Sequence, residues 1–499
     1  MSAASPVFPG SLSNRLLKRI FSFPVTIASL LAVLAELTVR SRFNDPDMWW
    51  HLRVGQIVWT THAIPTTDLF SFTTNHHAWI PHEWLSQTVI FAAYHWAGYS
   101  GLMVWLCFFT SAVFIAGYVL CSLYSGNLKV SFLGALVIFV FATVGVSIRP
   151  QLIGYLLLIF ELLLIHLGRS RNPRWFWLLP PLFALWVNCH GSFFLGMILA
   201  AAFLFSSFFN FQLGSLKAER WSLHAIKAFS LAMIVSIAAL FANPVGLKLI
   251  LYPLDALLHQ PVGLSIVQEW HPLHLTSARG IILLVVLGSI FLLTVLQKSQ
   301  LLLDELLLLV IGIWLAGSHD RLLFVFGILA APILSRMLAN SWENYDAATD
   351  RRLPNGIMVA AVCAFLYFAF PKPVKLAVQV EQNSPAKAVE FIRSRHLSGP
   401  MLNDYTYGGF LIWAMPEEPV FIDGRGDVFE WVGVLQEYED WATLNVDPQK
   451  LLEKYNIQYC LLTLNSPITH VLPLMQWKAV YTDSNSVIFV RSQTTSQIQ

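Results

Sequence analysis

The stretch "RSRFNDPDMWWHLRVGQIVW" (Arg40–Trp59) follows the first long apolar run and gathers acids, arginines, a histidine and a tryptophan pair. The whole chain has 499 residues, of which 56% are hydrophobic and 12% charged. A soluble domain carries about 25% charged residues, so this composition is typical of an integral membrane protein. The net charge of +2 argues against nucleic acid as a partner. The stretch therefore predicts ionisable chemistry where the chain leaves the lipid.

A helix that crosses a membrane needs about 20 mostly apolar residues, and the chain holds about eleven such stretches. They are 22–39, 101–123, 129–147, 151–168, 174–189, 192–211, 225–243, 279–297, 301–317, 321–338 and 354–371. The segment Glu83–Trp96 is short and polar, so we expect it to lie in the plane of the interface. Lys and Arg are most frequent in the loops that face the cytoplasm if the N-terminus is cytoplasmic. The pattern predicts a multi-pass protein of the inner (cytoplasmic) membrane.

This orientation places nearly all the chemically capable polar residues on the outer side. The first outer loop (40–100) and the short turns 147–151, 188–192, 243–246 and 318–321 lie there, as does the segment 268–274. We predict a polytopic helical domain over 1–371 and an extracytoplasmic soluble α/β domain over 372–499. In the second domain, "PVFIDG" (419–424) and "IQYCLLTL" (457–464) are expected as strands, followed by a hairpin that turns at Asp483–Asn485.

The acids of the first outer loop admit two interpretations. Asp47, Trp50 and His51 have the spacing that puts side chains on one face of a helix. Pro46 suits the start of that helix and Asp45 suits its cap, so the acids could simply stabilise the helix end. Alternatively, Asp47 or Asp45 is a catalytic base, because a carboxylate beside lipid is costly unless it has a function.

Cationic side chains on the same side suit the binding of a lipid phosphate. The candidates are Arg149, His190, His51, Arg53, Arg321 and His319. Arg149 stands at the outer end of a span with no evident partner in the sequence, although its side chain could also reach toward lipid headgroups. A packed structural histidine at His190 and a structural ion pair at His319–Arg321 are the alternatives for those positions.

Further polar residues are candidates for contact with an acceptor or for lining a cavity. They are Glu83, Trp84, Asn188, Glu269, Asp423 and Arg425. The Gly- and Asp-rich stretch Asn403–Asp427 is expected to lie over the membrane site, or alternatively to form ordinary turns around a packed helix. Asp404, Tyr405 and Asp427 belong to this stretch as well.

A carboxylate base, cations for a phosphate and a lipid-facing entrance suit one reaction class. In that reaction an acceptor attacks a sugar whose leaving group is a polyprenyl phosphate. No G-x-S-x-G, HExxH or Walker-type loop is present to favour hydrolase, zinc protease or ATPase activity. A glycan ligase that uses a lipid-pyrophosphate donor and a non-enzymatic lipid or glycan transporter are the competing hypotheses.

The quoted stretch, together with "HEWLSQ", "RPQL", "WVNCHGSFFLG" and "FIDGRGD", resembles the GT-C superfamily of polytopic glycosyltransferases. This superfamily includes protein O-mannosyltransferases and lipid A aminoarabinose transferases. The resemblance implies a membrane glycosyltransferase with a polyprenyl-phosphate sugar donor and a lipid, glycan or protein acceptor. It gives the role of base to Asp47 or Asp45. The spacing of Asp45 and Asp47 also resembles the acidic pair that binds a divalent cation in the oligosaccharyltransferase branch. The resemblance therefore leaves open whether a divalent cation is a cofactor, and no other cofactor is expected.

Overall fold

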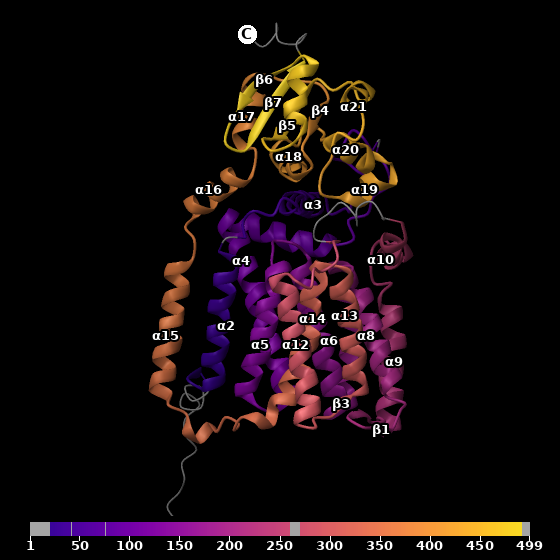
Figure 1. The fold of residues 1–499 in the computed structure, drawn as a ribbon, viewed down its shortest axis with the longest axis vertical. Helices are drawn as coiled ribbons and strands as arrows, with labels where there is room; N and C mark the ends of the chain where they lie inside the picture. The colour runs from indigo at the N-terminus through magenta and orange to yellow at the C-terminus, as the bar shows by residue number, and fades with distance from the viewer. Residues whose placement is uncertain (1–19, 41, 75, 260–269, 492–499) are drawn as a thin grey trace, which may run out of the picture.

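The computed structural model describes residues 20–40, 42–74, 76–259 and 270–491. Its larger part is a set of upright helices, and a smaller part with a β-sheet is stacked on one end of them (Figure 1). Every stretch predicted as a span contains helix. These helices are α2 (Phe23–Val39), α4 (Trp84–Ser125), α5 (Leu128–Phe141), α6 (Gln151–Ser170), α7 (Leu179–Cys189), α8 (Phe193–Ser206), α9 (Leu223–Ala239), α12 (Ala278–Leu296), α13 (Leu303–Ser318), α14 (Leu323–Leu338) and α15 (Arg352–Ala369).

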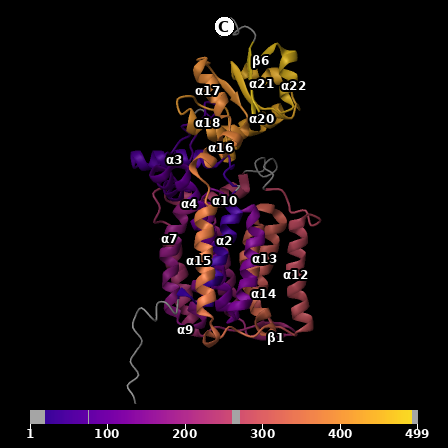
Figure 2. The same cartoon turned by 90° about the vertical axis from the view of Figure 1, so that its left-hand side faces the viewer.

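Length and apolar composition would let 5 of the described helices cross a membrane, and further apolar helices are shorter. The number that cross therefore stays a prediction. Among these five, the helical segment Asp320–Ser341, which contains α14, is the most enclosed, with 78% of its apolar window buried. By contrast, α15 has only 6% of its window buried and stands at the periphery beside α2 (Figure 2). An apolar helix exposed all along its length suits contact with lipid rather than water.

Small residues bring the central helices together. A Cβ atom added at Gly134 of α5 would lie 2.2 Å from Ser335 Oγ on α14 and 2.6 Å from Cys121 Sγ on α4. Any larger side chain would push these helices apart, which is the usual reason for glycine between membrane helices. Asn127 begins α5 by accepting hydrogen bonds from the backbone N–H groups of Lys129 and Val130.

The long helix α4 is interrupted where the sequence predicts a change of direction. Ala97 and Gly98 leave the helical conformation, and Gly98 has a φ of 56°. An L-side chain is disfavoured there, so glycine permits the bend. The first part of α4, from Trp84 to Trp96, is thus separated from the part that runs through the bundle. Its placement within an interface stays a prediction.

The first loop contributes α3 (Met48–Thr61), which lies across the end of the upright helices that faces the sheet (Figure 1). At the opposite end, β1 (Phe211–Leu213), β2 (Leu216–Ala218) and β3 (Leu301–Leu302) form a small three-stranded sheet. The helix α10 (Leu247–His259) stands at the same end as α3. The bundle thus presents its first loop toward the C-terminal region.

The C-terminal region holds a four-stranded sheet in the order β4-β5-β7-β6. Its strands are β4 (Met401–Asn403), β5 (Tyr459–Thr463), β6 (Trp477–Thr482) and β7 (Ser486–Arg491), and β4 is parallel to β5 while the other pairs are antiparallel. Helices α16 (Pro373–Asn383), α17 (Ala386–Ser394), α18 (Gly408–Ala414), α19 (Gly426–Trp431), α20 (Val434–Ala442), α21 (Pro448–Lys454) and α22 (Ile468–Val471) accompany it. The boundary at 371/372 itself stays a prediction.

Two of the strand predictions are confirmed and one is wrong. The hairpin of β6 and β7 turns at Asp483, whose side chain accepts hydrogen bonds from the N–H groups of Asn485 and Ser486. The strand β5 also lies where it was expected. The stretch 419–424 is not a strand of this sheet, because Val420 pairs instead with the first loop in an isolated parallel bridge to Ser71.

Candidate functional site

Asp45, Asp47 and Arg149 form one ionic centre between the first loop and the start of α6. Arg149 Nε donates to Asp45 Oδ2 at 2.6 Å and Nη2 donates to Asp45 Oδ1 at 2.8 Å. Arg149 Nη1 lies 3.1 Å from Asp47 Oδ2. One guanidinium therefore holds both carboxylates, in the forked geometry that arginine favours with carboxylate groups.

This geometry corrects two expectations. Arg149 has partners after all, and they lie about a hundred positions away in the chain, which is why the sequence concealed them. Asp45 does not cap α3. Asp47 occupies the N-cap position but makes no side-chain capping bond, and Asp45 accepts the N–H of Asp47 at 3.0 Å while its carboxylate faces Arg149.

The two acids differ in their surroundings. Burial alone would raise the pKa of Asp45, but the charge of Arg149 and its hydrogen bonds bring that pKa below its usual value. Both Asp45 oxygens accept hydrogen bonds from Arg149, and the Asp45 side chain is 6% exposed against 19% for Asp47. Asp47 is therefore the more accessible carboxylate, and Asp45 the more firmly fixed one.

The C-terminal region covers Asp47 through Gly424. A Cβ atom at Gly424 would lie 1.8 Å from Asp47 Oδ1 and 3.4 Å from Trp50 Nε1. Only a residue without a side chain permits this approach. A second glycine of this region, Gly409, faces the Pro46 carbonyl oxygen in the same way, at 2.4 Å from its added Cβ. The acids thus lie at the contact between the first loop and the C-terminal region.

A second acidic centre surrounds Glu83, just before α4. Glu83 Oε1 lies 3.3 Å from His190 Nε2 and 3.8 Å from His82 Nε2. Glu83 Oε2 lies 3.8 Å from His51 Nδ1. Gln87 places its amide nitrogen 3.0 Å from the same His51 nitrogen, which fixes the orientation of that ring. One carboxyl group thus lies among three imidazoles.

Burial shifts the pKa of each group in this second centre in the direction that favours its uncharged form. It raises the pKa of Glu83 to about 8, against the smaller opposing effects of Arg321 and Arg149. It lowers the pKa of His82 and of His190 to about 3, and it holds the pKa of His51 well below the usual value. At neutral pH the centre is an uncharged carboxylic acid among neutral imidazoles.

The turn 188–192 is tied to the start of α4. Trp84 Nε1 donates to Asn188 Oδ1 at 2.9 Å, and Asn188 Nδ2 donates to the carbonyl oxygens of Ala184 and Ala242 at 2.8 and 2.9 Å. Ser192 Oγ lies 2.8 Å from His190 Nδ1 and orients that ring toward Glu83. Asn188 and Trp84 therefore hold together three segments at this end of the bundle, and their predicted contact with an acceptor stays untested.

The turn 318–321 joins the site from α13 and α14. Arg321 Nη2 donates to Gln151 Oε1, and the guanidinium lies 5.5 Å from the ring centroid of Trp270. His319 Nδ1 lies 2.7 Å from the Trp270 carbonyl oxygen. Gln151 follows Arg149 by two residues, so this turn stands next to the ionic centre. Arg321 also acts electrostatically on Glu83, which places its charge near both acidic centres.

Three predicted residues lie apart from these centres. Arg53, on α3, donates to Gln56 Oε1 at 2.6 Å within its own helix. Arg425 is 2% exposed and is bound by Asp423 and by Asp68 of the first loop, at 2.6 and 2.7 Å. This buried pair joins the first loop to the C-terminal region, so the geometry favours a positioning role for Asp423 and Arg425. Glu269 lies outside the described residues.

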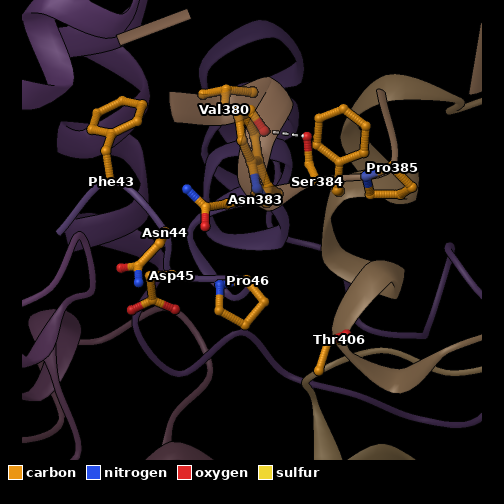
Figure 3. Close-up of a pocket in the computed structure, with 11 residues that line it drawn as sticks. Phe43, Asn44, Asp45, Pro46, Val380, Asn383, Ser384, Pro385 and Thr406 are labelled. Atoms are coloured by element: carbon orange, nitrogen blue, oxygen red, sulfur yellow. Dashed lines mark hydrogen bonds between the residues drawn. The ribbon is translucent and has the colours of Figure 1, made fainter. Parts of the chain in front are cut away.

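Two cavities lie beside the first loop. The smaller is lined by Asp45, Asn44 and residues of α16 and the following turn (Figure 3), and its volume is about 10 Å³. That is room for about one water molecule. The larger has a volume of about 800 Å³ and is lined by Val58, Trp59, His62, Ile64, Trp84, Thr88 and Pro244. Ligand pockets commonly measure about 300–1,000 Å³.

Sequence reasoning missed four participants: His82, Gln87, Tyr252 and Gly424. Tyr252 of α10 stacks on His82 with ring centroids 4.0 Å apart and donates to Asp427 Oδ2 at 3.0 Å. His82 directly precedes Glu83, and Gln87 follows it at helical spacing, so adjacency to a candidate acid was a usable signal for these two. Tyr252 and Gly424 join the site only through tertiary contacts, which no local pattern records.

No set of ligands for a metal ion is present in the described ranges. No group of three or more His, Cys, Asp or Glu side chains there is arranged to hold such an ion. The acidic pair that suggested a divalent cation is occupied by Arg149 instead. The residues that are present therefore do not fit the cation implied by the oligosaccharyltransferase resemblance.

The chain was compared with known protein families, curated proteins and solved structures, and only solved structures are similar to it. No protein-family model matches the chain, and no curated protein matches it. The archaeal oligosaccharyltransferase AglB from Archaeoglobus fulgidus, in complex with an inhibitory peptide and a dolichol-phosphate, superimposes with a TM-score of 0.56 at 12% identity over 94% of this chain and 74% of that chain. The chain shares the fold of this oligosaccharyltransferase. This confirms the resemblance expected from the sequence at the level of fold.

Two further solved structures are similar to this chain. The Archaeoglobus fulgidus oligosaccharyltransferase tethered with an acceptor peptide matches with a TM-score of 0.54 at 13% identity, covering 95% of this chain and 74% of that chain. ArnT from Cupriavidus metallidurans, bound to undecaprenyl phosphate, matches with a TM-score of 0.44 at 11% identity, covering 96% of this chain and 98% of that chain. At these identities the likeness concerns the fold and leaves the reaction to be argued from the site.

Proposed function

We propose that this protein transfers a sugar from a polyprenyl-phosphate donor to an acceptor on the outer face of the inner membrane. The proposal rests first on one observation. The Asp47 carboxylate is held between the Arg149 guanidinium and Gly424, at the end of a bundle of apolar helices. An accessible carboxylate fixed beside a permanent cation suits a base that acts next to an anionic leaving group.

In the proposed reaction, the acceptor hydroxyl or amine attacks the anomeric carbon of the sugar. Its proton passes to an Asp47 oxygen as the new bond forms. The bond between the anomeric carbon and the phosphate oxygen breaks, and the electron pair leaves with the polyprenyl phosphate. Arg149 and Arg321 are the nearby positive charges that offset the charge growing on that phosphate. One displacement of this kind inverts the anomeric configuration.

The larger cavity supports the lipid part of the proposal. Its lining is mostly apolar and aromatic, and Trp84 connects it to Glu83, the neighbouring residue in the chain. A polyprenyl chain or the face of a sugar ring would remove this apolar surface from water. With the N-terminus cytoplasmic, the cavity and both acidic centres would lie at the outer surface of the membrane.

The test is a transfer assay with purified protein in which Asp47→Asn is compared with the wild type. We expect loss of transfer in the variant with only a small fall in melting temperature, since asparagine keeps the shape but accepts no proton, and Arg149 stays paired with Asp45. Arg53→Ala is the matched control on the same loop and should remain active. Normal transfer by Asp47→Asn would reject Asp47 as the base.

The same assay distinguishes the competing functions. A polyprenyl-phosphate monosaccharide and a polyprenyl-pyrophosphate oligosaccharide are supplied side by side. Transfer from the first donor alone supports the proposal, and transfer from the second alone identifies a glycan ligase. Movement of a lipid-linked sugar across a vesicle bilayer without covalent change would identify a transporter.

A further inference from the structure

We propose that Arg149 takes the place of a divalent cation at the Asp45–Asp47 pair, so that the protein works without a bound divalent metal. The part of this inference that concerns metal binding stands by itself. Only its consequence for catalysis rests on the proposed glycosyl transfer.

The geometry carries the inference because the guanidinium does what a metal ion would do at such a pair. Two carboxylates separated by one residue repel each other, and partial burial strengthens the repulsion. Arg149 bridges them with three nitrogens, two to Asp45 at 2.6 and 2.8 Å and one to Asp47 at 3.1 Å. The single positive charge of Arg149 thereby offsets the repulsion between the two acids, and its nitrogens, which belong to the chain itself, fix both in one orientation.

A divalent ion would need the same oxygen lone pairs. Mg²⁺ and Mn²⁺ bind through carboxylate and carbonyl oxygens in a nearly octahedral arrangement. Here both Asp45 oxygens and one Asp47 oxygen already face guanidinium nitrogens, and Gly424 packs against the remaining Asp47 oxygen. An entering ion would have to displace Arg149 and then remain close to its positive charge.

Among the described residues, no group of three or more His, Cys, Asp or Glu side chains is arranged to hold a metal ion. The Glu83 carboxyl interacts electrostatically with Asp47 and Arg149, but burial raises its pKa to about 8, so it is protonated at neutral pH. The neighbouring turn contributes another cation, Arg321, which donates to Gln151. The charges near the pair are thus already balanced by arginines, which stay protonated across the physiological range.

The proposal is tested by Mn²⁺ binding to the full-length protein in detergent, measured by electron paramagnetic resonance. The wild type is compared with Arg149→Ala and with the double variant Arg149→Ala/Asp47→Asn. Arg393→Ala removes the same charge from an exposed pair with Glu417 and is the matched control. We expect saturable binding of one Mn²⁺ only in Arg149→Ala, and its loss in the double variant.

Melting temperature gives a second readout. Mn²⁺ should raise the melting temperature of Arg149→Ala and leave the wild type and Arg393→Ala unchanged. Arg149→Gln serves in the same way if the alanine variant does not fold. Saturable Mn²⁺ binding by the wild type that disappears in Asp47→Asn would overturn the proposal, as would failure of every folded Arg149 variant to bind Mn²⁺.

Catalysis is examined separately. If the proposed transfer is observed, it should survive treatment of the wild type with EDTA, and a loss that Mn²⁺ or Mg²⁺ restores would overturn the inference. If no transfer is found with any donor, the proposed function fails. The Mn²⁺ measurements would still decide the occupancy of the acidic pair, so the two failures are distinguishable.

Discussion

The protein holds two acidic centres near one end of its helical bundle, and they are built on opposite electrostatic principles. At Asp45 and Asp47, a guanidinium within hydrogen-bonding distance keeps the carboxylates charged. At Glu83, the partners are three neutral imidazoles, and burial keeps the carboxyl protonated. The difference teaches that burial favours the uncharged form of an acid unless a cation in direct contact stabilises the charged form.

This contrast suggests a division of labour between the centres. A carboxylate that is charged at neutral pH can accept a proton, whereas an uncharged carboxylic acid can donate a hydrogen bond to an anionic or polar group without repelling it. The first centre therefore suits the base of the proposed transfer. The second suits uncharged contacts beside the phosphate of the proposed donor.

The largest expected effect comes from breaking the first centre. Arg149→Ala leaves two carboxylates without their cation, and removal of one partner from a buried ion pair costs about 3–5 kcal/mol. We expect a clear fall in melting temperature together with loss of transfer. Thermal unfolding in detergent, with Arg393→Ala as the control, measures the first effect. A variant as stable as the wild type would show that Arg149 does not hold the acids.

The next effect concerns the cover over Asp47. In Gly424→Ala the added methyl carbon would lie 1.8 Å from Asp47 Oδ1, which is far inside van der Waals contact. Asp47 or the loop must move, and a displacement of about 1 Å near a reacting group can reduce the rate about 100-fold. Transfer kinetics should show a lower kcat with smaller change in melting temperature. Gly433→Ala is a control away from the site, because an added Cβ there meets no neighbour, although its positive φ will cost some stability.

The third prediction tests the second centre through pH. The pKa of Glu83 is about 8 in the folded protein against an ordinary value of 4.5, so the folded state binds the extra proton between these values. Stability should therefore fall as pH rises through that window. His82 and His190, with their pKa values lowered to about 3 from 6.5, act in the opposite direction only below pH 6.5.

The interval from pH 6.5 to pH 8 thus excludes these two histidines, and comparison with Glu83→Gln isolates Glu83 from other buried carboxyl groups. Melting temperatures across this interval should decline in the wild type and should decline less in Glu83→Gln, which is uncharged at every pH. Equal slopes in the two proteins would show that Glu83 is already ionised when folded. The comparison between the two centres would then lose its basis.

The smallest effect concerns the support of the second centre. Trp84→Phe removes the hydrogen bond from Trp84 Nε1 to Asn188 Oδ1 and keeps most of the apolar contact. A single hydrogen bond contributes about 0.5–1.5 kcal/mol, so a modest drop in melting temperature is expected. Trp96→Phe, at a position that is 79% exposed, is the control and should melt like the wild type. A loss as large as that of Arg149→Ala would contradict the assignment of Trp84 as a support.

The sequence by itself determined the class of the protein. A run of apolar stretches predicts helices because backbone polar groups in lipid must be satisfied within the segment itself, and each predicted span does contain helix. The hairpin that turns at Asp483 was also predicted from the sequence, because a turn depends on adjacent residues. The quoted stretch Arg40–Trp59 also singled out Asp45 and Asp47, which the structure brings together with Arg149.

Only the tertiary structure decided which groups surround those acids. Asp45 and Arg149 are about a hundred residues apart, and nothing local reveals that Arg149 bridges the acidic pair instead of standing alone. Arg425, a candidate for the cavity, is bound by Asp68 across 357 positions and joins two regions. A side chain's charge and role depend on burial and on the groups that surround it, and these neighbours are brought together only when the chain folds.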